Sequence, residues 1–357
     1  MGFAKAFTPA SVPNMSAAIS RPVGLLWLLA ALLWIAAATM MFWAPDRWWV
    51  AALPALVLSQ VLIVDAWHDA RVGTVANLIL LVPIALASLL HAPWSFGSEY
   101  GRGVKGLAGG AVSPASVVTE HDIAGLPVPL RRYLRYTGAI GQPRIQNFRV
   151  RFGGGIREGA DDAFMASTTD QFSQVQPASR WFLMRANRAG VPFEALHVYS
   201  GPHATFRVRV AGLVTVVDAN GPEMDQSETV TLFNDLCLLA PAALISAHVI
   251  WHPVDDHTVR ARFENAGHSI EAELVFNDDG ALTTFSSADR YASADGKTYT
   301  REEWTTPVSS YRWFGSRRVV ATADARWTGR RGDFAYARFA VTDIAYNVSD
   351  PLREPHS

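Results

Sequence analysis

Three long apolar stretches near the N-terminus constrain what this chain can fold into more than any other feature. Between Pro22 and Ala92 the charged residues are confined to two clusters, namely Asp46 and Arg47, and Asp65, Asp69 and Arg71. The stretches between these clusters approach the roughly 20 residues that cross a hydrocarbon core about 30 Å thick. Backbone amides inside lipid need internal partners, so such stretches are helical. We therefore expect about three transmembrane helices, over approximately 23–44, 48–67 and 72–92, after an N-terminal tail over 1–22.

A cleaved signal peptide is the alternative explanation of the first stretch. Lys5 and Arg21 precede an apolar core, and Ala36–Ala38 is similar to a cleavage site. A secreted protein would not carry two further long apolar stretches after its signal peptide. The sequence therefore favours a multi-pass protein of the inner (plasma) membrane, with the lipid bilayer as its first partner.

The basic residues that flank the three stretches leave the membrane orientation open. Cytoplasmic loops carry an excess of Lys and Arg. One side of the membrane would hold Lys5, Arg21 and Arg71, and the opposite side Arg47, Arg102 and Lys105. Because the two counts are equal, charge alone selects neither orientation.

Composition excludes two kinds of interaction. Lys and Arg number 31 against 32 Asp and Glu, which gives a formal net charge of −1. Domains that bind nucleic acid are basic or carry a basic stripe, so we expect no nucleic-acid partner. Cys237 is the only cysteine, so no disulfide forms within the chain.

Residues 93–117 are rich in glycine and follow the apolar region directly. The glycines are Gly97, Gly101, Gly103, Gly106, Gly109 and Gly110. Such a density is typical of a flexible tether. A phosphate-binding loop is the alternative, but no Gly-Lys-Ser/Thr follows. We expect a linker over 93–117, a soluble domain over 118–349 and a C-terminal tail over 350–357.

Beyond Gly141 the hydrophobic pattern has a period of two residues. Apolar and charged residues alternate in four segments, 147–152, 205–210, 259–263 and 270–276. This alternation is typical of antiparallel strands with one buried face. Further strands are expected near 283–291, 299–306, 317–327 and 334–346. A short amphipathic helix is expected over 120–137, ahead of the first strand.

One apolar helix interrupts the strands. Asp225 as N-cap and Glu228 three residues later fit a capping box, and five apolar positions between Leu232 and Ile245 continue the helix for about five turns. We expect Pro241 to bend or split it. Its apolar surface predicts that it lies against the sheet. The predicted fold class is an N-terminal α-helical transmembrane segment followed by an α+β domain, in which a curved antiparallel β-sheet forms a half-open β-barrel with a helix on its concave side.

An ordered series of landmarks runs through the soluble part. The landmarks are Leu126–Leu134, Gly138, Gly141, Pro143, Thr169–Phe172, Pro177–Trp181, Leu239–Leu244, Trp251, Asp289–Tyr291, Trp304, Tyr311 and Trp327. In these residues the chain resembles an uncharacterised bacterial membrane-anchored family, domain of unknown function 6544, which is itself similar to the LolA-like folds. The resemblance implies a half-open barrel closed by a helix, an apolar interior that in many relatives holds lipid, and a place on the periplasmic or exoplasmic face. It implies no catalytic residues. The chain departs from the family at Leu239-Ala240, where a tryptophan often precedes the proline.

The histidines are candidates for a metal site. His248, His252 and His257 cluster around Trp251, and on a helix the first two would be neighbours. Residues 247–254 instead have the pattern of a strand, on which His248 and His252 stand about 13 Å apart at roughly 3.3 Å per residue. We therefore expect surface histidines and no metal. No motif for a cofactor is present, and we expect none.

Acid–base chemistry requires ionisable groups that converge in a cleft. Asp170, His252 and Asp289 are the candidates for an enzyme that acts on a membrane-soluble substrate. Asp289 and Arg290 are also candidates for an internal ion pair, which is the structural interpretation of the same residues. No Gly-x-Ser-x-Gly elbow or cysteine–histidine signature accompanies them.

Large apolar side chains are abundant in the soluble part and are the candidates for a cavity lining. They are Trp181, Phe182, Phe193, Leu239, Trp251, Tyr291, Trp304, Trp313 and Phe314. An ordinary aromatic core is the alternative for each. A curved sheet with such a lining suits a lipid or another apolar ligand, because apolar pockets with few polar groups bind apolar molecules.

Three hypotheses for function follow from these patterns. The first is a non-catalytic, membrane-anchored protein that binds a lipid or other apolar ligand; the second is an enzyme in the same cavity. The third is a structural or sensory module for a protein partner, which the sequence does not identify. An open apolar cavity favours binding, two ionisable groups in contact at its floor favour an enzyme, and a filled interior favours the third.

Overall fold

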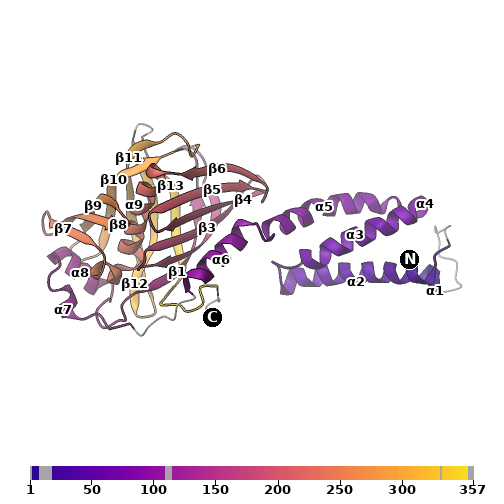
Figure 1. The fold of residues 1–357 in the computed structure, drawn as a ribbon, viewed down its shortest axis with the longest axis horizontal. Helices are drawn as coiled ribbons and strands as arrows, with labels where there is room; N and C mark the ends of the chain where they lie inside the picture. Colours follow the sequence, from indigo (N-terminus) through magenta and orange to yellow (C-terminus); the bar gives the residue numbers. More distant parts are fainter. Residues whose placement is uncertain (1, 8–17, 109–114, 294, 330–331, 353–357) are drawn as a thin grey trace. The chain divides into compact units, whose positions relative to one another are not determined.

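The computed structural model describes residues 2–7, 18–108, 115–293, 295–329 and 332–352 (Figure 1). The chain divides into two units, Met1–Ser95 and Phe96–Ser357. The first is helical and the second is built around one large sheet.

Apolar helices make up the N-terminal unit. Its elements are α1 (Gly2–Phe7), α2 (Arg21–Trp43), α3 (Trp49–Asp65), α4 (Trp67–Ala70) and α5 (Gly73–Leu90). Two of these, α2 and α5, are long and apolar enough to cross a membrane, whereas α3 has only 17 residues. The expectation of about three such helices is therefore corrected to two, because Asp65 ends α3 and the charged segment after it forms the separate helix α4.

Polar side chains join α3 to α5 inside this unit. The side-chain amide of Asn77 donates to Oε1 of Gln60 at 3.0 Å and to Oγ of Ser59 at 3.2 Å, and Gln60 donates to Oγ1 of Thr74 at 3.2 Å. Hydrogen bonds of this kind stabilise helix pairs in apolar surroundings. They explain why the least apolar of the three stretches contains Ser59 and Gln60.

The second unit contains a 13-stranded antiparallel sheet. Its strands are β1 (Asn147–Ile156), β2 (Met165–Gln174), β3 (Ser179–Arg188), β4 (Val191–Ser200), β5 (His203–Val210), β6 (Val214–Asn220), β7 (Val249–Pro253), β8 (Thr258–Asn265), β9 (His268–Phe276), β10 (Leu282–Ala292), β11 (Thr300–Phe314), β12 (Arg317–Gly329) and β13 (Gly332–Tyr346). Their order is β6-β5-β4-β3-β2-β1-β13-β12-β11-β10-β9-β8-β7. Every neighbouring pair is consecutive in the chain except β1 and β13. The predicted curved antiparallel half-barrel is confirmed, and the four alternating segments all lie in strands.

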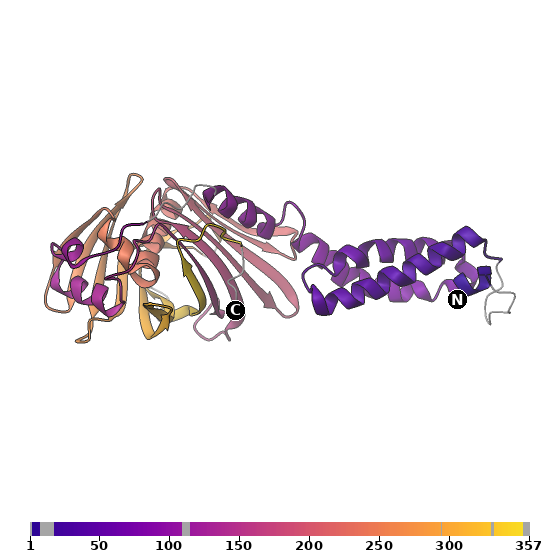
Figure 2. The same cartoon turned by 90° about the horizontal axis from the view of Figure 1, so that it is seen from below.

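Helix α9 (Pro222–Leu239) connects the two outer strands, β6 and β7, and crosses the concave face (Figures 1 and 2). It contacts β5 and β6 on one side and β9, β10 and β12 on the other. Fourteen of its 18 residues are buried, six of them polar, and the prediction that the helix lies against the sheet is confirmed. The helix ends at Leu239, and a 3-10 turn, η1 (Pro241–Ile245), follows, so the predicted break at Pro241 is confirmed.

The predicted start of this helix is wrong by four residues, because the N-cap is Gly221 and not Asp225. Pro222 occupies the first turn, where its missing N–H costs nothing, and Gly221 precedes it with φ +99°. Asp225 therefore lies inside the helix, and its Oδ1 accepts a hydrogen bond from the backbone N–H of Ala204 at 2.6 Å. Glu228 is not a capping residue and points into the interior, which is described below.

A filled aromatic core lies between α9 and the strands β8 to β10. Phe233 of α9 stacks on Phe263 with ring centroids 4.7 Å apart, and meets Phe285 edge-on at 5.8 Å and Trp251 at 6.2 Å. Such pairs add to the apolar burial that holds the helix. This half of the concave side is therefore solid.

Two short helices, α7 (Glu120–Ile123) and α8 (Val128–Tyr136), stand where one helix over 120–137 was expected. Pro127 separates them as the N-cap of α8. The hydroxyl of Tyr133, which is fully buried, donates to the carbonyl of Cys237 at 2.7 Å and so fixes α8 against the end of α9.

The segment predicted as a flexible linker contains helix α6 (Phe96–Ala108), which packs on β3 and β4. Phe96, Tyr100 and Val104 are buried against apolar residues of the sheet. Gly103 allows the close approach, because a Cβ there would lie 2.2 Å from the ring of Trp181. The glycines indicated flexibility, but at this position the small residue permits helix–sheet packing. Residues 109–114, which include two of the glycines, lie outside the described residues.

Candidate functional site

A cavity of about 720 Å³ lies between α9 and the concave face of the sheet. Its lining is mainly apolar and comes from α9, β1 to β6 and β10 to β13. Large apolar side chains of this lining include Phe152, Phe182, Met184, Phe206, Phe334 and Phe339. Phe339 meets Phe152 and Phe182 with ring centroids 5.5 and 6.2 Å apart, so the rings form a continuous surface.

Four of the nine residues predicted to line a cavity do so: Phe182, Leu239, Tyr291 and Trp304. The other five lie outside the lining. Trp181 faces α6, because consecutive strand residues point to opposite faces of a sheet. Trp251 packs on Phe233 in the filled core.

The remaining three lie nearer the ends of strands. Phe193 is half-buried on β4, and Phe314 is partly buried against the core at the end of β11. Trp313 is 52% exposed. These three side chains are large and apolar, but they do not line the cavity because they lie near the ends of their strands.

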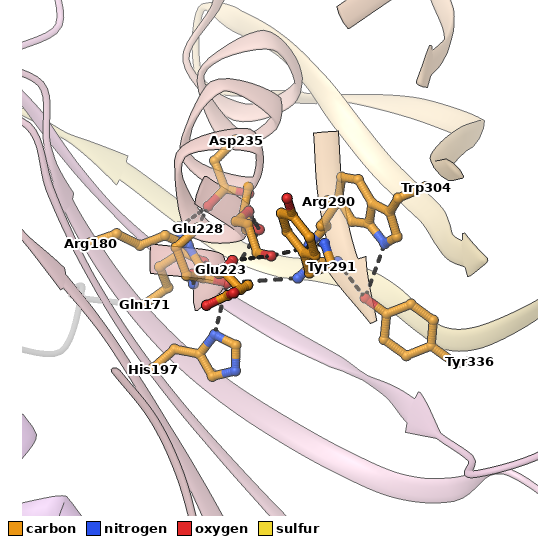
Figure 3. Close-up of polar contacts among 12 residues, drawn as sticks. Gln171, Arg180, His197, Glu223, Glu228, Asp235, Arg290, Tyr291, Trp304 and Tyr336 are labelled. Carbon is orange, nitrogen blue, oxygen red and sulfur yellow. Dashed lines mark hydrogen bonds and ion pairs between the residues drawn. The ribbon is translucent and has the colours of Figure 1, made fainter. Parts of the chain in front are cut away.

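One side of the cavity is a buried charge cluster, formed by Gln171, Arg180, His197, Glu228, Asp235 and Arg290 (Figure 3). Two strands and the helix bring its first half together. Arg180 of β3 donates from Nε to Oδ2 of Asp235 at 2.6 Å, and from Nη1 to Oε2 of Glu228 at 3.2 Å. Its Nη2 donates to Oε1 of Gln171 at 3.3 Å, and Gln171 also donates to Asp235 at 2.7 Å. Arg180 therefore links both helix carboxylates to the sheet.

Arg290 of β10 forms the other half of the cluster. Its Nη2 lies 3.6 Å from Oε1 of Glu228, and its Nη1 donates to the hydroxyl of Tyr336 at 3.0 Å. The guanidinium lies over the ring of Trp304, 4.3 Å from its centroid, and Nε1 of Trp304 also donates to Tyr336 at 3.1 Å. Stacking of this kind suits arginine, whose planar cation is weakly hydrated.

The ionisation of the cluster follows from its burial and its charges. Burial opposes the ionisation of Glu228, but the neighbouring His197, Arg180 and Arg290 outweigh it and hold its pKa well below the usual range. Burial raises the pKa of Asp235, with Arg180 and Gln171 offsetting part of the effect. Burial also lowers the pKa of His197, against the attraction of Glu228. At neutral pH Glu228 is therefore ionised, and Nδ1 of His197 lies 3.2 Å from its Oε1.

The acid–base candidates from the sequence lie outside the cavity. Asp170 shares a face of the sheet with α6 and pairs with Arg151 at 3.1 Å and Arg185 at 3.3 Å. His252 is exposed on β7. Neither group meets a second ionisable group at the cavity floor.

The expected ion pair between Asp289 and Arg290 is wrong. Adjacent strand residues point in opposite directions, so Arg290 faces Glu228 while Asp289 pairs with Arg301 on the neighbouring strand. Asp289 also accepts the backbone N–H of Glu271 at 2.6 Å, which makes it a structural residue of the outer face.

The three histidines near Trp251 do not converge on a metal. His257 pairs with Asp278 at 2.8 Å, and His252 lies on a strand as expected. Within the described residues no group of three or more His, Cys, Asp or Glu side chains has the geometry to hold a metal ion.

Sequence reasoning missed most of the buried charge cluster. Glu228 was interpreted as a capping residue, and Arg180, His197 and Asp235 were not singled out. One signal was present: Glu228 and Asp235 are seven residues apart, which places both carboxylates on one face of a helix that was predicted to lie against the sheet. Charges repeated on a buried helix face require partners from the opposite wall.

The family of unknown function (DUF6544) matches residues 116–339, which is well over half of the chain. The match runs from just before α7 into β13 and so includes α9, the cavity walls up to Phe339 and the whole buried charge cluster. The N-terminal helical unit lies outside it. No curated protein matches the chain. The chain belongs to this family of unknown function.

Proposed function

We propose that this protein is a non-catalytic, membrane-anchored binding protein that holds a lipid or other apolar ligand in the cavity of its half-barrel. The observation that carries the proposal is the cavity itself, about 720 Å³ with mainly apolar walls and polar groups on one side. Binding sites for small molecules have roughly 300–1,000 Å³ and a mainly apolar lining with a few placed polar groups.

The size and lining of the cavity set the scale of the expected affinity. Burial of one methylene group contributes about 0.8 kcal/mol. A chain of about a dozen methylenes would therefore contribute roughly 10 kcal/mol before the entropic costs of association are subtracted. The cavity thus suits one acyl chain better than a polar metabolite.

The exposed apolar surface of the helical unit supports anchoring in a membrane. Leu32 and Ile35 of α2 and Ile79 of α5 are 53%, 62% and 69% exposed, and they are typical of many side chains on these helices. Such surface is stable in lipid and costly in water. We place the protein in the inner (plasma) membrane, with α3 as a third apolar helix beside α2 and α5, and the sheet domain on the periplasmic or exoplasmic face.

Binding is tested by filling the cavity. Ala323 lines the cavity on β12, and the neighbouring Thr322 lies outside the lining, where it bonds to Ser310 on the outer face. The full chain in phosphatidylcholine nanodiscs is titrated with the neutral fluorophore N-phenylnaphthylamine, with empty nanodiscs as the blank. We expect saturable binding to the wild type and to Thr322→Trp, and a large loss with Ala323→Trp. Equal binding by all three proteins, or no binding above the blank, would refute the proposal.

An enzyme is the second candidate, and the floor of the cavity favours it in one respect. Asp235 lies on the cavity lining with a raised pKa and within hydrogen-bond distance of Arg180, so ionisable groups do converge there. The two functions differ in their response to Asp235→Asn. If the protein only binds, the wild type leaves its ligand chemically unchanged and Asp235→Asn keeps the wild-type affinity for the fluorophore. If the protein is an enzyme, Asp235→Asn keeps that affinity but no longer converts the lipid that the wild type converts.

A further inference from the structure

The lining of the cavity has an apolar part and a polar part, and this difference bears on the ligand. Phe152, Phe182, Met184, Phe206 and Phe339 pack together in one part of the lining. Arg290, Trp304 and Tyr336 also line the cavity and contact one another (Figure 3). A ligand that fits both parts is amphipathic, with an apolar chain and one polar head.

The charge of Arg290 is only partly neutralised. Its side chain is 10% exposed, and its carboxylate partner Glu228 lies 3.6 Å from Nη2. Glu228 is shared with Arg180 at 3.2 Å and lies 3.2 Å from His197. Nε of Arg290 is buried and has no hydrogen-bond partner among the described residues. A buried cation with an unused donor is costly unless a further acceptor reaches it.

Tyr336 supplies a second donor beside Arg290. Its hydroxyl oxygen accepts two hydrogen bonds, from Nη1 of Arg290 at 3.0 Å and from Nε1 of Trp304 at 3.1 Å. The oxygen is therefore saturated as an acceptor, and its own proton is free to be donated, since no acceptor for it is found within the described part of the chain. Two hydrogen-bond donors and a partly neutralised cation in the lining of an apolar cavity favour the binding of an anionic oxygen.

Two tryptophans hold the guanidinium in place for this purpose. Arg290 lies 4.3 Å from the ring centroid of Trp304 and 5.3 Å from that of Trp327, and both rings line the cavity. Stacking fixes the plane of the guanidinium and restricts its rotation. The donor is thereby held ready before a ligand arrives, which lowers the cost of binding.

We propose that the ligand is a single-chain amphipathic anion whose carboxylate or phosphate oxygens bind Arg290 and Tyr336 while its chain lies along the apolar walls. This inference rests on the proposed function and specifies its ligand class. The head group is not expected to bind to Arg180, because Arg180, Gln171 and Asp235 already hydrogen-bond to one another.

The test compares three ligands that have alkyl chains of the same length but different polar head groups. Palmitate, hexadecyl phosphate and methyl palmitate each compete with bound N-phenylnaphthylamine on the full chain in phosphatidylcholine nanodiscs. A charge-assisted hydrogen bond predicts that at least one of the two anions competes at least about tenfold more tightly than the ester. The tighter of palmitate and hexadecyl phosphate identifies the head as a carboxylate or a phosphate.

Variants assign the preference to named groups. Arg290→Gln and Tyr336→Phe are expected to lower the ratio of anion affinity to ester affinity, with each variant compared against its own affinity for the fluorophore. Tyr336→Phe removes one hydroxyl only, so it carries the test if Arg290→Gln does not fold. Arg301→Gln is the matched control, because this arginine lies on the neighbouring strand β11 and pairs with Asp289 outside the cavity.

Each outcome separates the two proposals. Equal competition by anions and ester, with fluorophore still bound, overturns the anionic head and leaves the binding function standing. An anion preference that survives Tyr336→Phe and Arg290→Gln also overturns the assignment. Failure of the wild type to bind the fluorophore or any of the three ligands overturns both the ligand class and the proposed function.

Discussion

Glu228→Gln is the substitution for which the structure makes its strongest prediction. Glu228 is fully buried and is the one carboxylate that Arg180, Arg290 and His197 all face, at 3.2, 3.6 and 3.2 Å. Glutamine keeps the shape and one acceptor but removes the negative charge. Arg290 then has no carboxylate within ion-pair distance among the described residues.

The size of the effect follows from the burial of the cations. Removal of one partner from a buried ion pair costs roughly 3–5 kcal/mol, because the other charge stays buried and unpaired. For a domain of this size such a loss in the free energy of unfolding lowers the Tm by roughly 6–20 °C. The full chain in detergent is heated while tryptophan fluorescence is recorded, since Trp304 and Trp327 lie beside the cluster.

The dependence of this effect on pH is fixed in sign. The folded-state pKa of Glu228 lies below its unfolded value, so the stabilisation is fully present above the unfolded pKa of about 4.3 and is lost as the pH falls through the folded pKa. The gap in Tm between wild type and variant is therefore present from pH 7 to about pH 5 and shrinks below about pH 4.

A matched control removes a carboxylate from the same sheet. Glu271→Gln breaks an exposed pair with Arg262 and is expected to leave the Tm unchanged, because water screens such pairs. If Glu228→Gln melted within a degree or two of wild type, the cluster would not hold the helix to the sheet, and the reasoning from buried charge would be refuted.

Three further predictions concern other parts of the chain. Asp235→Asn is expected to leave the Tm at pH 7 equal or higher, because the raised pKa of Asp235 means that its ionisation costs folding energy as the pH rises; a loss as large as that of Glu228→Gln would contradict this. Gly103→Val forces a side chain against Trp181 and is expected to destabilise by roughly 1–3 kcal/mol, measured by urea unfolding, whereas an unchanged midpoint would show that α6 does not pack as described. Asp278→Cys places a thiol on a side chain that is 97% exposed, while Cys237 is buried. An impermeant maleimide is expected to label it with only the outer membrane opened, and labelling that requires rupture of the inner membrane would place the domain in the cytoplasm.

Strand alternation was readable where charged residues alternate with apolar ones along the strand. The segments in β1, β5, β8 and β9 show it, and each lies in a strand. Strands β2, β3, β4 and β6 were not expected from the sequence. In β3 the reason is that both of its faces are covered. Trp181 and Leu183 pack against α6 while Phe182 and Met184 line the cavity, so an unbroken apolar run replaces the alternation.

The buried charge cluster was harder to predict for a different reason. Sequence patterns assign charged residues to the surface, and a charge is placed in the interior only when its partner is known. The partners of Glu228 are Arg180, 48 residues before it, and Arg290, 62 residues after it. Only the crossing of α9 over the concave face brings them together, and that crossing depends on the order of all 13 strands.

Glycine spacing misled the prediction for the segment after the apolar helices. Flexibility and close packing both select glycine, and the sequence does not distinguish them. The alternative was visible in part, because Phe96, Tyr100 and Val104 recur at a spacing of four, as on one face of a helix. The three residues are the ones that α6 buries.

Native mass spectrometry of the full chain, released from nanodiscs that retain the lipids of the cell, tests the central claim most directly. The account predicts a species heavier than the 39.0 kDa protein by one defined single-chain lipid at near-stoichiometric occupancy. It also predicts loss of this species with Ala323→Trp and its retention with Thr322→Trp. A wild-type protein found only at its own mass, or carrying the same mixture of lipids as both variants, would contradict the claim that the cavity is a binding site.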